Sequence, residues 1–243
     1  MPKSKDYQER SYRRSTGSAD LIAHEVIVGE TDVFISAEKD VSDIAGKIIR
    51  KYRSEIEAYI TGHPEFKTSL EPVDVNLPAP DIVKDMIRAS KSAGVGPMAA
   101  VAGAIAEFTG KEILALSRQV IIENGGDIFM VSEIERTVAV FAGDSPLTNR
   151  LFIKVRPEDT PIGICTSSGT VGHSLSFGKA DACVIMAVSA SLADAVATGT
   201  CNRVKNKEDI KQALEFALSI TGVRGALIAY EKDFGVLGNV ELA

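Results

Sequence analysis

The sequence predicts an α+β protein whose strands pair in antiparallel sheets. Short β-prone runs and helical runs occur in both halves of the 243-residue chain. They do not alternate strictly as strand, helix, strand, which is the order that builds a parallel sheet. A hydrophobic content of 45% and a charged content of 25% are sufficient for a packed core. We expect a basic N-terminal arm at residues 1–20 and one folded domain at residues 21–243, with a lobe boundary near residues 72–80.

The first half of the chain is predicted to begin with a hairpin and to continue with helices. Two β-prone runs flank a polar turn, which predicts the hairpin. Further on, apolar residues recur at three- and four-residue steps opposite a charged face, which predicts an amphipathic helix. The expected elements are strands at residues 21–28 and 33–36, followed by helices at residues 40–62, 81–93 and 98–106.

The second half is predicted to contain most of the sheet. Apolar, β-branched runs bounded by Gly, Asn and Asp are typical of strands, and two longer runs are typical of helices. The expected strands lie at residues 119–123, 128–131, 138–141, 151–155, 163–165, 182–188 and 226–229, and the expected helices at residues 191–204 and 207–220.

Composition and charge narrow the class of protein. The longest uncharged apolar stretch, residues 95–106, has 12 residues and is too short to span a bilayer. The N-terminus has no apolar segment typical of a secretory signal, so we expect a cytoplasmic protein without membrane association. The first fourteen residues carry a charge of +3 and the rest −9, which argues against nucleic-acid binding. The three cysteines have no CxxC spacing and are interpreted as buried thiols.

Two glycine-rich segments are candidate binding elements. Gly94-Val95-Gly96-Pro97 precedes a helix of small residues, and Pro97 suits its first turn. The free amides of that helix start could hold an anion, or the helix could simply be a tightly packed core element. Asn124-Gly125-Gly126-Asp127 lies between two predicted strands, where its glycines could permit close approach of the main chain to a ligand. On the residues alone, the pattern favours the alternative of a simple hairpin turn.

Two polar clusters carry the remaining candidate chemistry. Residues 165–174 form a loop of hydroxyls and glycines that includes His173, which suits a phosphate or carbonyl oxygen, although the GxSxG pattern of a serine hydrolase is absent. In the second cluster, Ser191 is a candidate N-cap, and Asp194 and Thr198 lie four residues apart on one helix face. A carboxylate and a hydroxyl are hard oxygen ligands suited to Mg²⁺, but Asp194 could also serve only the helix dipole.

The order of these motifs resembles the ApbE-like superfamily of FAD-binding flavin transferases. The resemblance rests on the Asn124 to Ile128 segment, the Thr166-Ser167-Ser168-Gly169 segment with His173, and the Ala193 to Thr198 segment. With the Gly96 segment added, the chain is most similar to a short branch related to ApbE. The resemblance covers residues 80–205 by motif. It implies a T-fold-like α+β architecture in which FAD lies in a cleft between two lobes.

The resemblance also implies roles for individual residues. Asp194 and Thr198 would hold Mg²⁺ near the pyrophosphate of FAD, and His173 with Asp194 would act in catalysis. The residues implied to contact the cofactor are Gly96, Asn124, Gly125, Gly126, Asp127, Thr166, Ser167, Ser168 and Gly169.

The reaction and the assembly state stay open at the level of sequence. The implied activity is cleavage of the FAD pyrophosphate or transfer of its FMN part. The small-residue helix stands where flavin transferases carry a Gly-rich segment with a lysine. An enzyme acting on another phosphorylated cofactor precursor, such as a pterin, is therefore one alternative, and a non-catalytic cofactor-binding or assembly protein is the other. The amphipathic helix at residues 40–62 would also suit a homodimer interface.

Overall fold

The fold is built on one large antiparallel sheet. The computed structural model describes residues 18–74, 78–170 and 177–243. Within these ranges, eight strands pair in the order β1-β2-β3-β4-β7-β8-β9-β10, and every neighbouring pair is antiparallel. The strands are β1 (Ile22–Val28), β2 (Thr31–Ala37), β3 (Val120–Asn124), β4 (Asp127–Val131), β7 (Ile162–Ser167), β8 (Ala182–Ala187), β9 (Val223–Tyr230) and β10 (Asp233–Gly238).

A small second sheet and a set of helices complete the described part. The small sheet has the order β11-β6-β5 and is also antiparallel. Its strands are β5 (Arg136–Ala139), β6 (Phe152–Val155) and β11 (Glu241–Leu242). The α-helices are α1 (Ser42–Gly62), α2 (Glu65–Thr68), α3 (Asp81–Ala93), α4 (Val101–Ile113), α5 (Ala190–Cys201) and α6 (Ile210–Ser219), and the 3₁₀ turns are η2 (Pro97–Ala100), η3 (Pro157–Asp159) and η4 (Lys207–Asp209).

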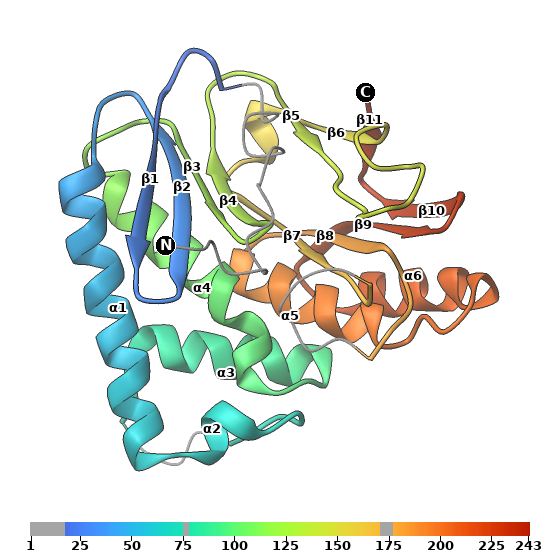
Figure 1. Ribbon diagram of the computed structural model, residues 1–243, viewed down its shortest axis with the longest axis horizontal. Coiled ribbons are helices and arrows are strands. Elements are labelled where there is room, and N and C mark those ends of the chain that lie inside the picture. Colours follow the sequence, from blue (N-terminus) through green and yellow to red (C-terminus); the bar gives the residue numbers. More distant parts are fainter. Residues whose placement is uncertain (1–17, 75–77, 171–176) are drawn as a thin grey trace, which may run out of the picture.

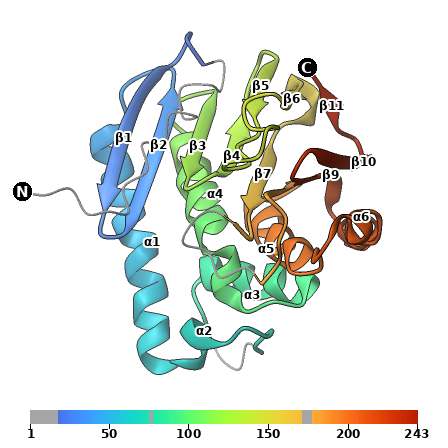
Figure 2. The same ribbon diagram turned by 45° about the vertical axis from the view of Figure 1, so that its right-hand side comes forward.

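These elements form three layers with two hydrophobic cores. The helices cover one face of the large sheet, and the small sheet covers part of the other face (Figure 1, Figure 2). One core joins the helices to the large sheet, and the second joins the two sheets. Strand β8 contributes to both cores, because its alternate residues point to opposite faces and all six are buried. A strand that is buried on both faces is expected to be a continuous run of apolar residues, and the sequence of β8 is such a run.

The predicted α+β class with antiparallel sheets is confirmed, with local differences. The helix expected at residues 98–106 is a 3₁₀ turn followed by the longer α4, since Ala100 leaves helical geometry at φ −115° and ψ 3°. Strand β10 was not predicted, because Gly235 and Gly238 weaken the β signal of its sequence. The polar run expected to be a loop from residue 165 continues as strand through Ser167.

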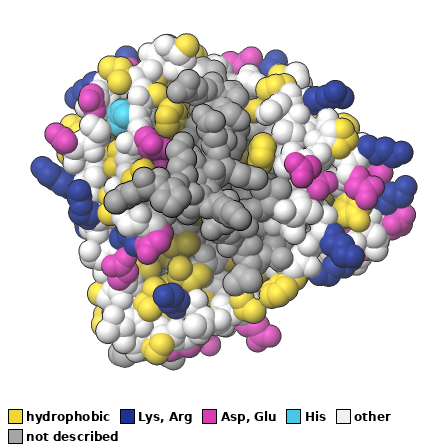
Figure 3. Space-filling view, viewed as in Figure 1, with side chains coloured by type: hydrophobic (Ala, Val, Ile, Leu, Met, Phe, Trp, Pro, Cys, Tyr) yellow, Lys and Arg dark blue, Asp and Glu magenta, His cyan; other side chains and the backbone are white. Residues whose placement is uncertain are grey.

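Two observations concern the outside of the molecule. In the part of the chain that the structure describes, no helix is long and apolar enough to cross a membrane. On the face shown in Figure 3, acidic and basic side chains of the described residues are interspersed, and no broad basic surface is seen among them.

Candidate active site

Helix α5 carries the two predicted metal ligands on one face. Its N-cap is Ser189, whose Oγ accepts a hydrogen bond from the Leu192 amide at 3.3 Å. The prediction of Ser191 as N-cap is wrong, because Ser191 already lies inside the first turn and is fully buried. Asp194 lies one turn further along and Thr198 a turn beyond it, so both project from the same side of the helix.

The carboxylate of Asp194 is held by the N-terminus of α4. Its Oδ2 accepts a hydrogen bond from the Gly103 amide at 2.9 Å, and the Ala102 amide also stabilises its charge. These amides have no partner within their own helix, since they belong to its first turn. The sequence left open which anion, if any, lies at the start of the small-residue helix. In the structure it is the carboxylate of Asp194, which caps α4 rather than its own helix α5.

The double glycine forms the tip of the β3–β4 hairpin. Gly125 and Gly126 have φ values of +68° and +104°, and a Cβ at either position would meet no atom of the described residues within 4 Å. Positive φ at both positions is what a two-residue hairpin turn requires, so the hairpin prediction is confirmed. Asn124 joins this hairpin to α4, because its Nδ2 donates to the Ala102 carbonyl at 3.1 Å. The space in front of the glycines allows close approach to the main chain.

Asp127 and Asp194 converge although 67 positions separate them in the sequence. Asp127 pairs with Asn124 at the start of β4 and is 7% exposed, and its Oδ1 has no hydrogen-bond partner among the described residues. Burial raises the pKa of Asp127 well above its ordinary value, and the nearby charge of Asp194 raises it further. Burial also raises the pKa of Asp194 to about 7, against the stabilising Gly103 and Ala102 amides. The buried carboxyl of Asp127 and the half-buried carboxyl of Asp194 therefore share one electrostatic environment.

Cys165 lies beside this pair, which the sequence did not indicate. Its Sγ donates to the Ala190 carbonyl at 3.3 Å, and it is fully buried in β7. Burial raises the pKa of the Cys165 thiol well above its ordinary value, and the charges of Asp127 and Asp194 act in the same direction. The group is therefore a neutral thiol next to the carboxyl pair. The sequence signal was only that Cys165 begins the polar run, and all three cysteines are buried as predicted.

The end of β7 brings part of the second motif to the same region. The Thr166 amide donates toward Asp127, which lowers the pKa of that carboxyl against the effect of burial. Ser167 is 4% exposed and its Oγ has no partner among the described residues. Ser168 and Gly169 follow the end of β7, where the Thr170 amide donates to Ser168 Oγ at 3.1 Å and the Gly169 amide donates to the Ala180 carbonyl at 2.9 Å. His173 falls outside the described residues.

Gly96 is placed by packing against another loop. A Cβ at this position would lie 1.8 Å from the Ser69 carbonyl oxygen, so only glycine fits there. The contact explains the glycine without a ligand. A cofactor contact of Gly96 stays a prediction.

The arrangement suits a hard divalent cation that keeps several ligands from water or substrate. Asp127, Asp194 and Thr198 offer only oxygen donors, and the Oδ1 of Asp127 is an acceptor that no described residue fills. No group of three or more His, Cys, Asp or Glu in the described ranges is spaced to hold a metal on its own. Mg²⁺ is commonly bound by one or two carboxylates together with substrate phosphates, so this donor set fits Mg²⁺.

The raised pKa of Asp194 predicts a specific pH dependence of stability in chelator. In the unfolded chain this carboxyl loses its proton near pH 3.8, whereas in the folded protein it keeps the proton up to about pH 7. The free energy of unfolding that this proton contributes is therefore complete below pH 3.8 and is lost as the pH rises to about 7. Burial lowers the pKa of His24, which contributes the opposite slope. Denaturant unfolding of wild type and Asp194→Asn across this range isolates the carboxyl contribution from that of His24. A difference between the two proteins that does not change with pH would contradict the assignment.

The sequence matches the family described as "AbpE bacteria" over residues 14–236. The chain belongs to this ApbE-like family. The UPF0280 protein of Methanocaldococcus jannaschii is 40% identical over 221 residues, which cover 88% of this chain and 90% of that protein. The UPF0280 protein of Methanopyrus kandleri is 40% identical over 220 residues, which cover 88% of this chain and 89% of that protein.

Solved structures agree with the family at the level of fold. The flavin transferase ApbE from Vibrio cholerae superposes with a TM-score of 0.58 and 10% identity, covering 90% of this chain and 96% of that one. The flavinyl transferase ApbE from Pseudomonas stutzeri, in its apo form, superposes with a TM-score of 0.58 and 11% identity, covering 90% of this chain and 94% of that one. This member of the ApbE-like family therefore shares the α+β fold of proteins that differ from it at most positions.

Proposed function

We propose that the protein binds FAD, or a closely related nucleotide with a pyrophosphate, together with Mg²⁺ at the Asp127 and Asp194 pair. The observation that carries the proposal is the buried Oδ1 of Asp127, which has no hydrogen-bond partner among the described residues and lies beside the half-buried carboxyl of Asp194. Two carboxylates held this close repel each other unless a proton or a cation lies between them. The fold shared with two flavin transferases favours a flavin nucleotide as the source of the phosphates.

In this proposal each element of the site has a separate task. Asp127, Asp194 and Thr198 would hold Mg²⁺, and Gly103 keeps Asp194 turned toward Asp127. The open main chain of Gly125 and Gly126 leaves room for the pyrophosphate, which a side chain there would obstruct. Ser167 offers a hydroxyl without a partner among the described residues. The contacts of Gly96, Ser168 and Gly169 with the nucleotide belong to the same proposal.

The proposed reaction is attack on the phosphorus of the FMN half of FAD, which breaks the pyrophosphate bond and releases AMP. Water as the nucleophile would give FMN, and an acceptor group as the nucleophile would take up the FMN part. A bound Mg²⁺ would neutralise the phosphate charge and so make AMP a better leaving group. The carboxyl pair would fix where that charge sits at the edge of the apolar core. His173 is proposed as the residue that moves a proton. The cleft between two lobes is part of this proposal.

Retention of flavin tests the proposal. Purified protein is incubated with FAD and Mg²⁺, desalted, and examined by absorbance, and the filtrate is assayed for AMP. We expect Mg²⁺-dependent flavin retention, and AMP in the filtrate if the protein is an enzyme. A protein that retains no flavin and releases no AMP, but is stabilised more by a phosphorylated pterin than by FAD, would contradict the proposal. Retention without AMP would leave a cofactor-binding protein.

A further inference from the structure

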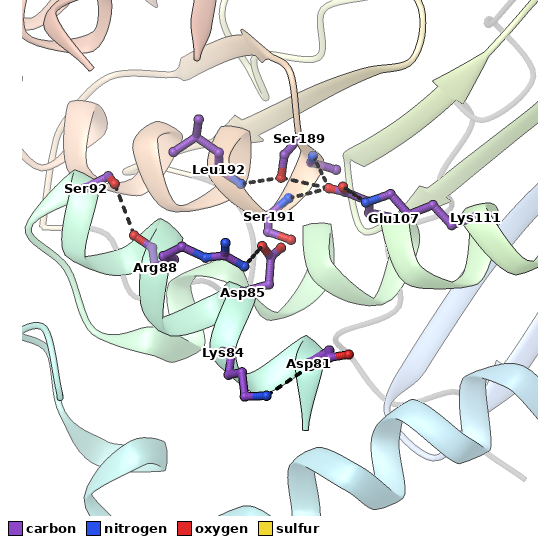
Figure 4. A network of polar contacts seen from close by, with 11 residues as sticks. Asp81, Lys84, Asp85, Arg88, Ser92, Glu107, Lys111, Ser189, Ser191 and Leu192 are labelled. Atoms are coloured by element: carbon purple, nitrogen blue, oxygen red, sulfur yellow. Dashed lines mark hydrogen bonds and ion pairs between the residues drawn. The ribbon is translucent and has the colours of Figure 1, made fainter. Parts of the chain in front are cut away.

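A buried carboxylate outside the proposed ligand set caps helix α5. Glu107 lies on α4 and is 3% exposed. Its Oε2 accepts hydrogen bonds from the Ser189 hydroxyl at 2.8 Å, the Ala190 amide at 2.6 Å and the Ser191 amide at 3.3 Å (Figure 4). Its Oε1 contacts the Lys111 ammonium at 2.6 Å. One side chain of α4 thus satisfies the first amides of a different helix.

The capping is reciprocal between the two helices. Glu107 of α4 accepts from the N-terminus of α5, and Asp194 of α5 accepts from the Gly103 amide at the N-terminus of α4. Gly103 and Glu107 are four residues apart and lie on the same face of α4. Gly103, nearer the start of α4, contacts Asp194 in the second turn of α5, whereas Glu107, one turn later in α4, contacts Ser189 at the start of α5. The two helices therefore run in opposite directions at this contact. Each helix therefore supplies the anion that the free amides and the dipole of the other require.

The helices approach closely enough that this contact sets their relative position. A Cβ at Gly103 would lie 2.2 Å from the Ala190 carbonyl oxygen and 2.8 Å from the Asp194 Cβ. On the other side, a Cβ at Gly163 of β7 would lie 2.3 Å from the Ala190 Cα. The first turn of α5 is therefore held between α4 and β7, and Glu107 provides its polar attachment.

We propose that Glu107 is a positioning residue that sets the axial position and rotation of α5, and so aims the Asp194 carboxylate at Asp127. The expected effect on cation binding rests on the proposed function, whereas the positioning of Asp194 by Glu107 does not. Ala190 and Ser191 are fully buried, so without Glu107 their amides would have no partner unless α5 moved. A shift of α5 along its axis would carry Asp194 away from Asp127 and from the Gly103 amide.

Binding of Mn²⁺ to the full chain tests this role, with free Mn²⁺ measured by electron paramagnetic resonance. Glu107→Ala should raise the Mn²⁺ dissociation constant by roughly 10-fold or more, as loss of a residue supporting a ligand does. Glu107→Gln should stay within about threefold of wild type, because the amide oxygen still accepts from the α5 amides. Wild-type affinity in Glu107→Ala would overturn the proposal.

A control on the same helix separates positioning from stability. Glu112 also lies on α4, but its carboxylate accepts from Lys51 at 2.7 Å and Tyr52 at 2.5 Å, away from α5. Thermal unfolding in chelator gives the stability loss of each variant. Glu112→Gln should leave the Mn²⁺ affinity unchanged, whatever its melting temperature. Equal weakening of Mn²⁺ binding in Glu112→Gln and Glu107→Ala would show a purely structural role.

A metal-free measurement distinguishes failure of this inference from failure of the proposed function. Unfolding of Glu107→Ala, Asp194→Ala and the double variant is compared in chelator as a double-mutant cycle, because alanine removes the cap at each position. Reciprocal capping predicts that the two effects are not additive, whereas additive effects would overturn the positioning role. A wild type that binds no Mn²⁺ but shows non-additive effects would contradict the cation site and support the positioning of Asp194 by Glu107.

Discussion

Asp194→Asn is expected to abolish Mg²⁺-dependent retention of FAD and, at the same time, to stabilise the protein in chelator at about pH 8. Burial raises the pKa of Asp194 to about 7, so the folded protein bears an unfavourable, partly buried charge above that pH. Asparagine keeps an oxygen for the Gly103 amide but carries no charge. The gain should reach at most about 4 kcal/mol and vanish in acid, where the wild-type carboxyl is protonated.

Denaturant unfolding and flavin retention, measured on the same samples, check this result. Asp85→Asn is a matched control, since Asp85 lies on the neighbouring α3 and pairs with Arg88 at 3.1 Å. The control should retain flavin as wild type does and should not gain stability. Mg²⁺ with FAD should stabilise wild type and leave Asp194→Asn unchanged. An Asp194→Asn variant that still binds flavin with Mg²⁺ would remove this carboxylate from the site.

Gly103→Ala is expected to cause a large loss of stability, about 3 kcal/mol. The added Cβ would lie 2.2 Å from the Ala190 carbonyl oxygen of α5. Neither atom can move away easily, because each is attached to the backbone of a helix. Separation of α4 from α5 would also take the Gly103 amide away from Asp194, so cation affinity should fall with stability. The free energy of unfolding from denaturant titration and the Mn²⁺ affinity report the two effects.

Gly62→Ala provides the matched control for that substitution. Gly62 is the last residue of α1, and a Cβ there would meet nothing within 4 Å. Alanine should therefore be neutral or stabilising, by up to about 1 kcal/mol, because it lowers the entropy of the unfolded chain. If Gly103→Ala unfolded at the same denaturant concentration as Gly62→Ala, the close approach of α4 and α5 would be wrong.

Periodicity and turn chemistry account for most of the elements that could be predicted. The bounds of α3 match the prediction, since its apolar spacing and the left-handed Gly94 after it are both local signals. The Gly125-Gly126 hairpin was predictable for the same reason. By contrast, β10 carries two glycines and takes its strand conformation from pairing with β9, which is a tertiary effect that a local pattern does not record.

The sequence was sufficient to predict the main residues of the candidate site, but not which of them lie close together or which residues support them. Asp127 and Asp194 were found through motif order, and their convergence needs the pairing of β4 with β7 and the packing of α5 between them and α4. Glu107 has no local signal at all. Its neighbours in sequence suggest an exposed helix charge paired with Lys111, and its partners lie more than eighty residues away in α5. Burial of a carboxylate by a distant helix end is visible only in three dimensions.

Crystals of the protein grown with Mn²⁺ and FAD would test the central claim most directly, through the anomalous scattering of Mn²⁺. We predict one anomalous peak within coordination distance of carboxylate oxygens of both Asp127 and Asp194, with phosphate density beside it in front of Gly125 and Gly126. A peak elsewhere, or nucleotide bound with both carboxylates free of metal and phosphate, would contradict the account.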